Sequence, residues 1–370
     1  MALRGGRVAD GPNPYGDLPP SAYWRSGVAE AGIFGLSGLW RSAWALPSDA
    51  RFATFGSCFA QHISRALVAR GMPWVDAEPA PGRCPPDLAR RFGFGVFSAR
   101  TGNIYTAAQL LCHARLAAGT DDPDSIETWE QGGRHHDSLR PAIEPGGFAS
   151  LAEAQLSRRS MVRGFARAVR QADVLVFTLG LTEGWRSVAT GQPYAMCPGT
   201  TAGRFDPGAH RFENAGYPEV RAALEEAIGI LRGLNPRLRV LLTVSPVPLT
   251  ATASGQHVLV ATGWSKATLR AVAGDLAARD AGIDYFPSFE IITGAPARAM
   301  FFDPNLRTVA PAGVDLVMRH FFAGLDLSAP SAHGDPVPDT ARLAEAAMAA
   351  GDLVCEEEIL GTLAGGLDRG

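Results

Sequence analysis

The sequence predicts an α/β fold in which a doubly wound parallel sheet is covered by helices on both faces, giving three layers. Four apolar runs of strand length occur at 52–57, 173–180, 238–246 and 284–292. The first three are nearly continuous in Val, Leu, Phe and Thr, which is typical of parallel strands buried on both faces. Amphipathic helical patterns alternate with these runs and indicate right-handed βαβ crossovers.

The helices follow from apolar residues at helical spacing and from local start and stop signals. They are expected at 58–70, 105–118, 148–171, 217–233, 265–281 and 311–323. Gly71 follows the first helix, Pro218 lies in the first turn of the fourth, and Pro311 begins the last, where a missing N–H has no cost. The strand and helix signals therefore agree along the chain.

Two insertions interrupt this alternation. Residues 72–145 contain a possible short strand at 73–78 and a hairpin that turns at Gly132-Gly133. Residues 186–216 contain a second hairpin around Thr190-Gly191. Because insertions after strand ends lie over the carboxyl edge of a parallel sheet, both are expected to cap a crevice there.

The ends of the chain differ in composition from its middle. Residues 1–50 are rich in Gly, Pro, Trp and Tyr without a sustained period, which predicts an extended N-terminal arm. Residues 51–325 are expected to form the α/β domain. Residues 326–370 begin with a Pro-, Ser- and Gly-rich linker and end in Ala-rich, acidic helices, which are expected to pack elsewhere or to contact a protein partner.

Charge and composition argue against several classes of function. The 370 residues carry a formal net charge of −3, so no basic field attracts nucleic acid or an anionic membrane. The absence of a signal-like segment and of a membrane span predicts a soluble, cytoplasmic protein. The five cysteines lack CxxC spacing and the eight histidines lack HExxH, so no metal is expected.

The run RFATFGSCFAQHISRAL at 51–67 begins as a strand, passes through Gly56-Ser57-Cys58 and becomes amphipathic. Ligands of an open parallel sheet bind beyond the carboxyl ends of its strands, so this turn is expected to face the crevice. Ser57 is either the N-cap of the following helix or a nucleophile. From these residues alone the N-cap is favoured, because Ser is among the preferred N-cap residues.

The run Gly56-Ser57-Cys58-Phe59-Ala60 resembles the motif that names the GSCFA family, a branch of the SGNH/GDSL hydrolase-like superfamily with a flavodoxin-like sheet. The resemblance covers about residues 15–325. Further segments that resemble the family are FSARTGNIYTAAQLL (97–111), FTLGLTEGW (177–185), CPGTTAGRFDP (197–207), TVSPVPLTAT (243–252), HVLVATGWSKATLRAVAG (257–274), YFPSFEIITG (285–294) and AGVDLVMRHF (312–321).

This resemblance implies a serine-hydrolase site. Ser57 corresponds to the nucleophile, whose own N–H helps to hold the oxyanion, while Gly102 and Gly180 correspond to the glycines of the second and third blocks. Thr182 and Glu183 stand where the superfamily has Asn-Asp, which removes an amide donor worth on the order of 3 kcal/mol of barrier. The amide of the neighbouring Asn103 is a candidate replacement.

The base is the larger departure from the superfamily pattern. Its Asp-x-x-His block corresponds here to Asn305 and Thr308, and neither residue is a base at neutral pH. His257 follows a core strand and is the favoured replacement, although it could equally cap a helix or bond a loop carbonyl. Asp303 and Glu183 are carboxylates that could orient a histidine or act alone if burial raises the pKa.

Other nucleophiles and bases are less favoured. Cys58 begins a helix, where a thiol pKa is often depressed, but buried free cysteines are common. Ser265-Lys266 resembles a family motif, and Ser-Lys pairs perform acyl transfer in some enzymes. A lysine near a helix start is, however, more often solvated or paired with a phosphate or carboxylate. His62 and His320 are expected to pack rather than react.

Together these features predict a serine esterase or O-acyltransferase that acts through a Ser57 acyl-enzyme on an acyl ester, such as that of a carbohydrate, without a cofactor. The carbohydrate part rests on superfamily analogy. The alternative is a binding protein that keeps the crevice and has lost the base. It is supported by the missing Asp-x-x-His and by Thr182-Glu183.

Overall fold

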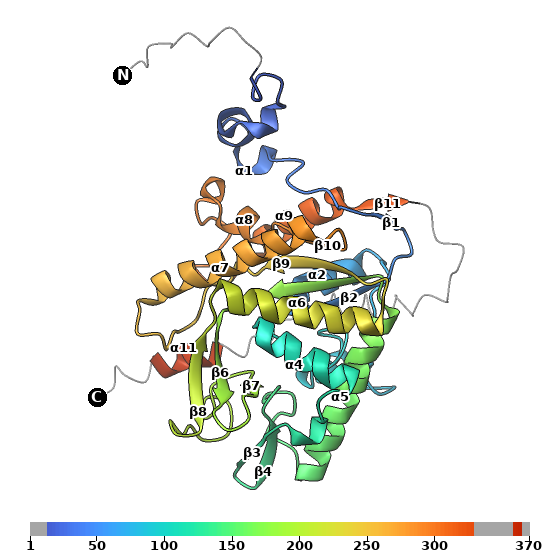
Figure 1. Cartoon of the computed structure of the whole chain (residues 1–370), viewed down its shortest axis with the longest axis vertical. Helices are drawn as coiled ribbons and strands as arrows, with labels where there is room; N and C mark the ends of the chain where they lie inside the picture. Colours follow the sequence, from blue (N-terminus) through green and yellow to red (C-terminus); the bar gives the residue numbers. More distant parts are fainter. Residues whose placement is uncertain (1–12, 329–357, 365–370) are drawn as a thin grey trace.

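The centre of the molecule is a parallel sheet of four strands in the order β10-β9-β5-β2 (Figure 1). The computed structural model describes residues 13–328 and 358–364. The strands are β2 (Phe52–Gly56), β5 (Val174–Leu179), β9 (Arg239–Val244) and β10 (Ile283–Phe286). Every residue of β2 and β5 is buried, as their continuous apolar runs predict. The predicted parallel α/β sheet is confirmed.

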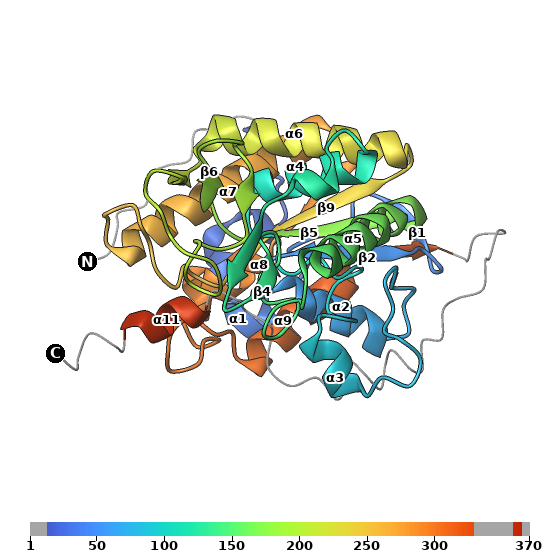
Figure 2. The same cartoon turned by 90° about the horizontal axis from the view of Figure 1, so that it is seen from below.

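Helices cover both faces of the sheet and give the predicted three layers (Figure 2). One face carries α4 (Ala107–Ala118), α5 (Leu151–Gln171), α6 (Tyr217–Leu234) and α7 (Val258–Arg279). The other carries α2 (Ala60–Ala69), α8 (Ser288–Thr293) and α9 (Pro311–Gly324). Because successive strand side chains point to opposite faces, Phe55 packs in the first apolar cluster and Phe52 in the second.

The sheet changes its direction of growth at β2. After α2 the chain returns beside this strand, where Trp74 forms an isolated parallel bridge with Phe52. The possible strand at 73–78 is reduced to this bridge. On the other edge of β2, β5 pairs first, and β9 and β10 add outward from it. The carboxyl end of β2 therefore lies at a topological switch point, where open α/β sheets bind their ligands.

Two expected elements have different bounds. The run 284–292 is a strand only as far as Phe286, because Pro287 follows and α8 begins at Ser288. The helix expected from 265 begins at Val258. Its first two turns carry exposed apolar side chains, including Leu259 and Trp264, which obscure the amphipathic pattern.

Both insertions contain the predicted hairpins. In the first, β3 (Thr128–Gln131) pairs with β4 (Arg134–Asp137). In the second, β6 (Glu183–Ser187) pairs with β7 (Pro193–Tyr194) on one edge and with β8 (His210–Asn214) on the other. The short helix α3 (Pro86–Arg91) precedes the loop that leads into α4.

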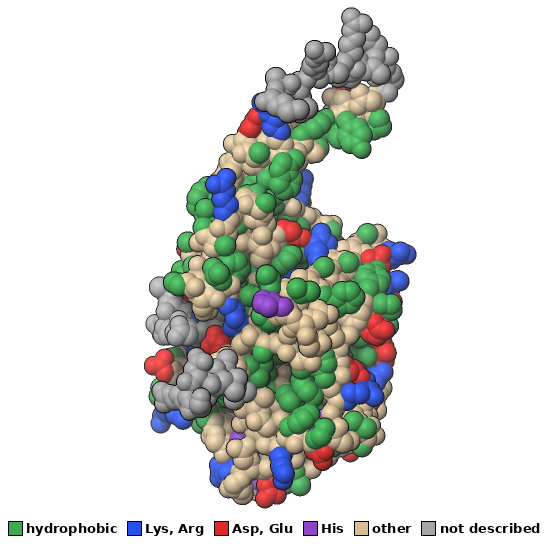
Figure 3. Space-filling view, turned by 90° about the vertical axis from the view of Figure 1, so that its left-hand side faces the viewer, with side chains coloured by type: hydrophobic (Ala, Val, Ile, Leu, Met, Phe, Trp, Pro, Cys, Tyr) green, Lys and Arg blue, Asp and Glu red, His purple; other side chains and the backbone are tan. Residues whose placement is uncertain are grey.

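The N-terminal residues from 13 onward contain short helical turns that extend beyond the rest of the molecule (Figure 1). They include α1 (Gly32–Gly35) and expose the aromatic side chains of Tyr15, Trp24 and Phe34, and hydrophobic side chains are visible on this extension in Figure 3. β1 (Ala45–Pro47) then pairs in parallel with β11 (Asp326–Ser328).

Within the expected C-terminal tail, the structure describes β11 and α11 (Glu358–Ala364), and residues 329–357 and 365–370 lie outside the described part. Ile359 and Leu360 of α11 pack against an apolar cluster that includes Tyr105 and Leu181. Across residues 13–328 and 358–364, no helix combines the length and apolarity needed to cross a bilayer.

Candidate active site

The turn after β2 is a tight elbow that requires glycine. Gly56 has a φ of +128°, and a Cβ there would lie 2.3 Å from the Thr178 carbonyl oxygen. Ser57 follows it, is 2% exposed, and donates its N–H to the same carbonyl at 3.0 Å. The Ser57 hydroxyl has no hydrogen-bond partner among the described residues. Buried polar groups are rarely left in this state, so the hydroxyl calls for a functional explanation.

Ser57 does not cap the helix that follows it. α2 begins at Ala60, its N-cap residue is Phe59, and no side chain accepts a hydrogen bond at this terminus. Ser57 contributes only its carbonyl oxygen, which accepts the Ala60 N–H at 2.9 Å. The N-cap interpretation is therefore wrong.

The loop that carries Gly102 and Asn103 lies beside the elbow. The Ile104 N–H donates to the Gly56 carbonyl at 2.9 Å and holds the loop against the end of β2. Gly102 has a φ of +64°, and its N–H meets no acceptor among the described residues. Asn103 is buried beside it. The structure thus brings Ser57, Gly102 and Asn103 together at one strand end.

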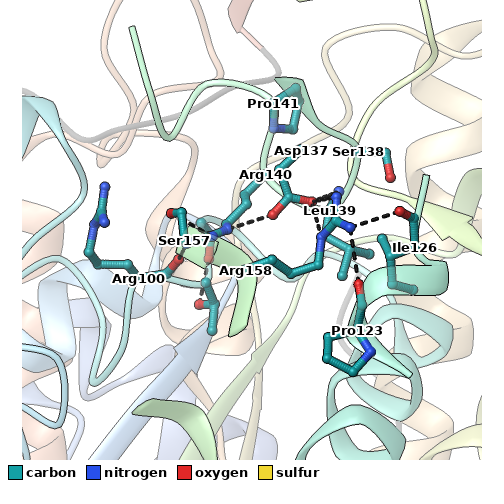
Figure 4. Close-up of polar contacts among 12 residues, drawn as sticks. Arg100, Pro123, Ile126, Asp137, Ser138, Leu139, Arg140, Pro141, Ser157 and Arg158 are labelled. Carbon is teal, nitrogen blue, oxygen red and sulfur yellow. Dashed lines mark hydrogen bonds and ion pairs between the residues drawn. The ribbon is translucent and has the colours of Figure 1, made fainter. Parts of the chain in front are cut away.

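A buried ion cluster anchors this loop (Figure 4). Asp137 accepts hydrogen bonds from Arg140 at 2.8 Å and from Arg158 at 3.0 Å, and all three side chains are fully buried. Arg140 also donates to the carbonyl of Arg100, two residues before Gly102, at 2.9 Å. Burial favours a raised pKa for Asp137, but the two guanidinium groups outweigh it and hold this pKa below its usual range. The sequence gives no signal for this cluster, because no local motif marks charges that meet only in the fold.

Gly180 packs directly against Ser57. A Cβ at Gly180 would lie 3.0 Å from the Ser57 Cβ and 3.1 Å from the Tyr105 carbonyl oxygen. The Gly180 N–H donates to this Tyr105 carbonyl at 3.0 Å, and the Thr182 hydroxyl donates to Asn214 at 2.7 Å. The Ser57 and Gly180 N–H groups and the Thr182 hydroxyl, which the resemblance assigns to an oxyanion hole, are therefore all engaged within the protein.

Glu183 begins β6 and lines a cavity of about 240 Å³. Its carboxylate accepts a hydrogen bond from the Thr252 hydroxyl at 2.7 Å. Burial raises the pKa of Glu183, while hydrogen bonds from Thr252 and from the Ala253 backbone oppose this rise. Glu183 is thus a carboxylate whose environment favours proton uptake.

Four of the residues that line this cavity are aromatic. They are Tyr105, Trp185, Tyr194 and Phe212. A second cavity, of about 500 Å³, shares Trp185 and Tyr194 with the first. Leu360 of α11 also lines the first cavity, so the C-terminal helix lies at its edge. Small-molecule sites typically combine apolar and aromatic side chains with a few polar groups, which here include Gln109, Glu183 and Thr252.

His257 and Asp303 are not hydrogen bonded to Ser57. His257 is the exposed N-cap of α7, where its Nδ1 accepts the Leu259 N–H at 3.2 Å. Asp303 lies in a surface loop in which its N–H donates to the Thr308 carbonyl at 2.9 Å. Asn305, at the position of the expected acid, bonds to the Thr308 side chain at 2.9 Å and so stabilises this loop.

Two other histidines lie on helices, His62 half-buried on α2 and His113 buried on α4. Burial lowers the pKa of His62 to about 4, with Arg65 adding to the effect, and lowers the pKa of His113 to about 4. His62 contacts Phe59, and His113 packs on Phe165 between α4 and α5. Both imidazoles are therefore neutral at pH 7. Among the described residues, no group of three or more His, Cys, Asp or Glu side chains is arranged to hold a metal.

Lys266 differs most from its expected environment. It is 3% exposed, and its Nζ donates to the Gly180 carbonyl at 2.7 Å. The adjacent Ser265 accepts the Thr182 N–H at 3.0 Å. The expectation of a solvated or anion-paired lysine depended on a helix that starts at 265. Because α7 starts at Val258, Lys266 lies about two turns inside it and faces the sheet.

Comparison with known proteins identifies a family match. A family model described as the GSCFA family matches residues 51–321. No curated protein sequence matches the chain. It is similar to the structure of a carbohydrate esterase family 3 protein from Talaromyces cellulolyticus, with 11% identity, 74% of this chain and 94% of that chain covered, and a TM-score of 0.32. It is also similar to a lipopolysaccharide acetyltransferase periplasmic domain from Salmonella ser. Paratyphi A, with 12% identity, 84% and 97% covered, and a TM-score of 0.28. These TM-scores are too low to bear on function.

Proposed function

The chain belongs to the GSCFA family, and we propose that it is an esterase or O-acyltransferase that forms an acyl-enzyme at Ser57. The observation that carries this proposal is the Ser57 hydroxyl, which is buried at the switch point of the sheet and has no partner among the described residues. The preceding Gly56 elbow costs backbone freedom, and strained strand-to-helix turns of this kind present nucleophiles in hydrolases.

In the proposed reaction, the Ser57 oxygen attacks the ester carbonyl carbon and the carbonyl oxygen becomes an oxyanion. The Gly102 N–H is the backbone donor that we assign to this oxyanion, because it meets no acceptor among the described residues. Gly180 allows the backbone to approach Ser57 closely, because an added Cβ would lie only 3.0 Å from the Ser57 Cβ. Collapse of the intermediate releases the alcohol, and water or an acceptor hydroxyl then takes the acyl group. The reaction needs no cofactor.

An acylated carbohydrate is the substrate class that we propose. The aromatic walls formed by Trp185, Tyr194 and Phe212 suit the apolar faces of sugar rings, and the cavity volume of about 240 Å³ suits a small ester. Glu183 at the same wall offers an acceptor for a sugar hydroxyl.

Labelling with a fluorophosphonate probe tests the nucleophile. We expect the wild type to label and Ser57→Ala not to label. Ser64→Ala is the matched control, because Ser64 is also buried but its hydroxyl donates to the Gln61 carbonyl in α2. It should label like the wild type. A wild type that stays unlabelled while a reference esterase reacts would refute the serine mechanism.

The second candidate is a binding protein of the same fold without catalytic turnover. The observation that favours it is the absence of any base hydrogen bonded to Ser57 in residues 13–328 and 358–364. Calorimetry with acetylated oligosaccharides separates the two candidates. Binding with unchanged ester content after prolonged incubation supports the binding protein, whereas release of acetate supports the enzyme.

A further inference from the structure

Lys266 is the only lysine in the chain, among 34 basic residues of which all the others are arginine. Every other basic side chain of this protein is an arginine, and a lysine occurs at this one position. That position is buried, with a side chain 3% exposed. Unlike a guanidinium, a lysine amine loses its proton when it is desolvated, and this is why lysines rather than arginines serve as general bases.

A single residue, Gly180, contacts both the Lys266 amine and the proposed nucleophile Ser57. Gly180 accepts the Nζ–H of Lys266 at its carbonyl, at 2.7 Å, while its Cα abuts Ser57, so that an added Cβ would lie 3.0 Å from the Ser57 Cβ. His257 is the N-cap of the same helix, about 13 Å farther along the helix axis than Lys266. The imidazole predicted as base is therefore more distant from the Gly180 junction than the amine.

We infer that Lys266 is the general base for Ser57, forming a Ser-Lys pair in place of the Asp-x-x-His block that this chain lacks. The inference rests on the proposed acyl transfer at Ser57. One N–H of the neutral amine holds the Gly180 carbonyl, and the nitrogen lone pair accepts the Ser57 proton. Ser57 makes no hydrogen bond to Lys266 in this structure, as is common for catalytic pairs before substrate binds.

The proposed acyl transfer carries one proton from Ser57 to the leaving alcohol through the Lys266 amine. As the Ser57 Oγ bonds to the carbonyl carbon, its proton moves to Nζ and the carbonyl π electrons pass to the oxygen. The C–O bond to the alcohol then breaks, and the ammonium returns the proton to the leaving oxygen. Water, or the hydroxyl of an acceptor, then attacks the acyl carbon and gives its proton to Nζ. The bond between the acyl carbon and Ser57 Oγ breaks, and the ammonium returns the proton to Oγ.

The other titratable groups around this junction come from four elements. Glu183 on β6 accepts from Thr252, and Glu213 on β8 pairs with Arg186. Tyr105 lies in the loop before α4, and Cys58 follows Ser57. The pKa of Glu183 is raised. An experiment on the pH dependence of activity must therefore distinguish titration of Glu183 from titration of Lys266.

Exchange of Lys266 for arginine tests the base directly, because the arginine side chain of Lys266→Arg still offers N–H donors toward Gly180 but stays protonated and cannot accept a proton. We expect kcat/KM for a nitrophenyl acetate to fall by about 10²-fold or more. Arg270→Lys, the reverse exchange on an outer position of α7, is the matched control and should retain wild-type activity. Lys266→Arg with more than a tenth of wild-type activity would overturn the inference.

A second measurement does not require a Lys266 variant that folds. With lysine labelled at Cε, the wild type contains a single side-chain resonance, that of Lys266. We expect this resonance to titrate with the same midpoint as the alkaline-rising limb of kcat/KM, and this limb to persist in Glu183→Gln. A lysine resonance that does not titrate across that limb overturns the inference. Loss of labelling in Ser57→Ala, measured separately, tells whether the proposed function itself stands.

Discussion

Replacement of Asp137 by Asn should destabilise the protein strongly, since it removes the anion shared by Arg140 and Arg158. All three side chains are fully buried, and the hydrogen bonds are 2.8 Å and 3.0 Å long. Breaking a buried ion pair on one side costs about 3–5 kcal/mol, because the remaining charge stays desolvated. For a cooperative unit of about 300 residues, 4 kcal/mol corresponds to a fall in Tm of about 6 °C.

Calorimetry and chemical unfolding measure this effect, and Asp124→Asn is the control. Asp124 pairs with Arg159 at the surface, where both side chains are more than a third exposed, and a pair of this kind contributes only about 0–1 kcal/mol. The two variants make the same chemical change in different surroundings. Equal decreases in Tm in both variants, or a decrease of less than about 2 °C in Asp137→Asn, would refute the assignment of the buried cluster as the anchor of this region.

The pH dependence provides an independent check on the same cluster. The pKa of Asp137 is lower in the folded state than in the unfolded chain. Its contribution to stability is therefore complete above the unfolded pKa, near 4, and is lost as the pH falls through the folded pKa. The difference in stability between the wild type and Asp137→Asn should narrow below about pH 4. A difference that grows on acidification would contradict this assignment.

Three further predictions concern single residues. Gly180→Ala places a Cβ 3.0 Å from that of Ser57, so esterase activity should fall by about 10²-fold while Tm changes little, because small displacements at a reacting group are costly; unchanged activity would contradict the packing. His257→Ala removes an exposed N-cap and should reduce activity less than about threefold and stability by about 1 kcal/mol; complete inactivation would restore His257 as the base. The pKa of His113 is lowered to about 4, so its buried neutral ring contributes stability above pH 6.5 that is lost on acidification toward pH 4. Protonation of the buried ring reduces the free energy of unfolding by about 3 kcal/mol. His113→Gln lacks this group, so it should lose less stability than the wild type over that pH range in urea unfolding.

The sheet and its switch point could be predicted from the sequence, because buried parallel strands require continuous apolar runs. The run ending at Gly56-Ser57 identifies the strand end at the crevice without any knowledge of its neighbours. Both hairpins were predicted for a similar reason, since Gly132-Gly133 and Thr190-Gly191 set the turns locally.

Bounds were less predictable where solvent-exposed apolar residues break the periodicity. Helix α7 begins before the expected position. Its start was not predicted because the exposed apolar side chains of Leu259 and Trp264 obscure the amphipathic pattern. Because the start of the helix was misplaced, the burial of Lys266 was not predicted. Lys266 lies about two turns inside the helix rather than at its start.

The α/β class, the turn from strand to helix at Ser57 and the family all follow from the amino-acid sequence, since they depend on local patterns of side chains. Which side chains and backbone groups come into contact, in contrast, depends on the three-dimensional fold. In the fold, the Thr182 hydroxyl donates to Asn214 and the Lys266 amine donates to the Gly180 carbonyl. Asp137 pairs with two buried arginines. Such contacts join residues far apart in the chain, and their energies depend on burial, which no short stretch of sequence specifies.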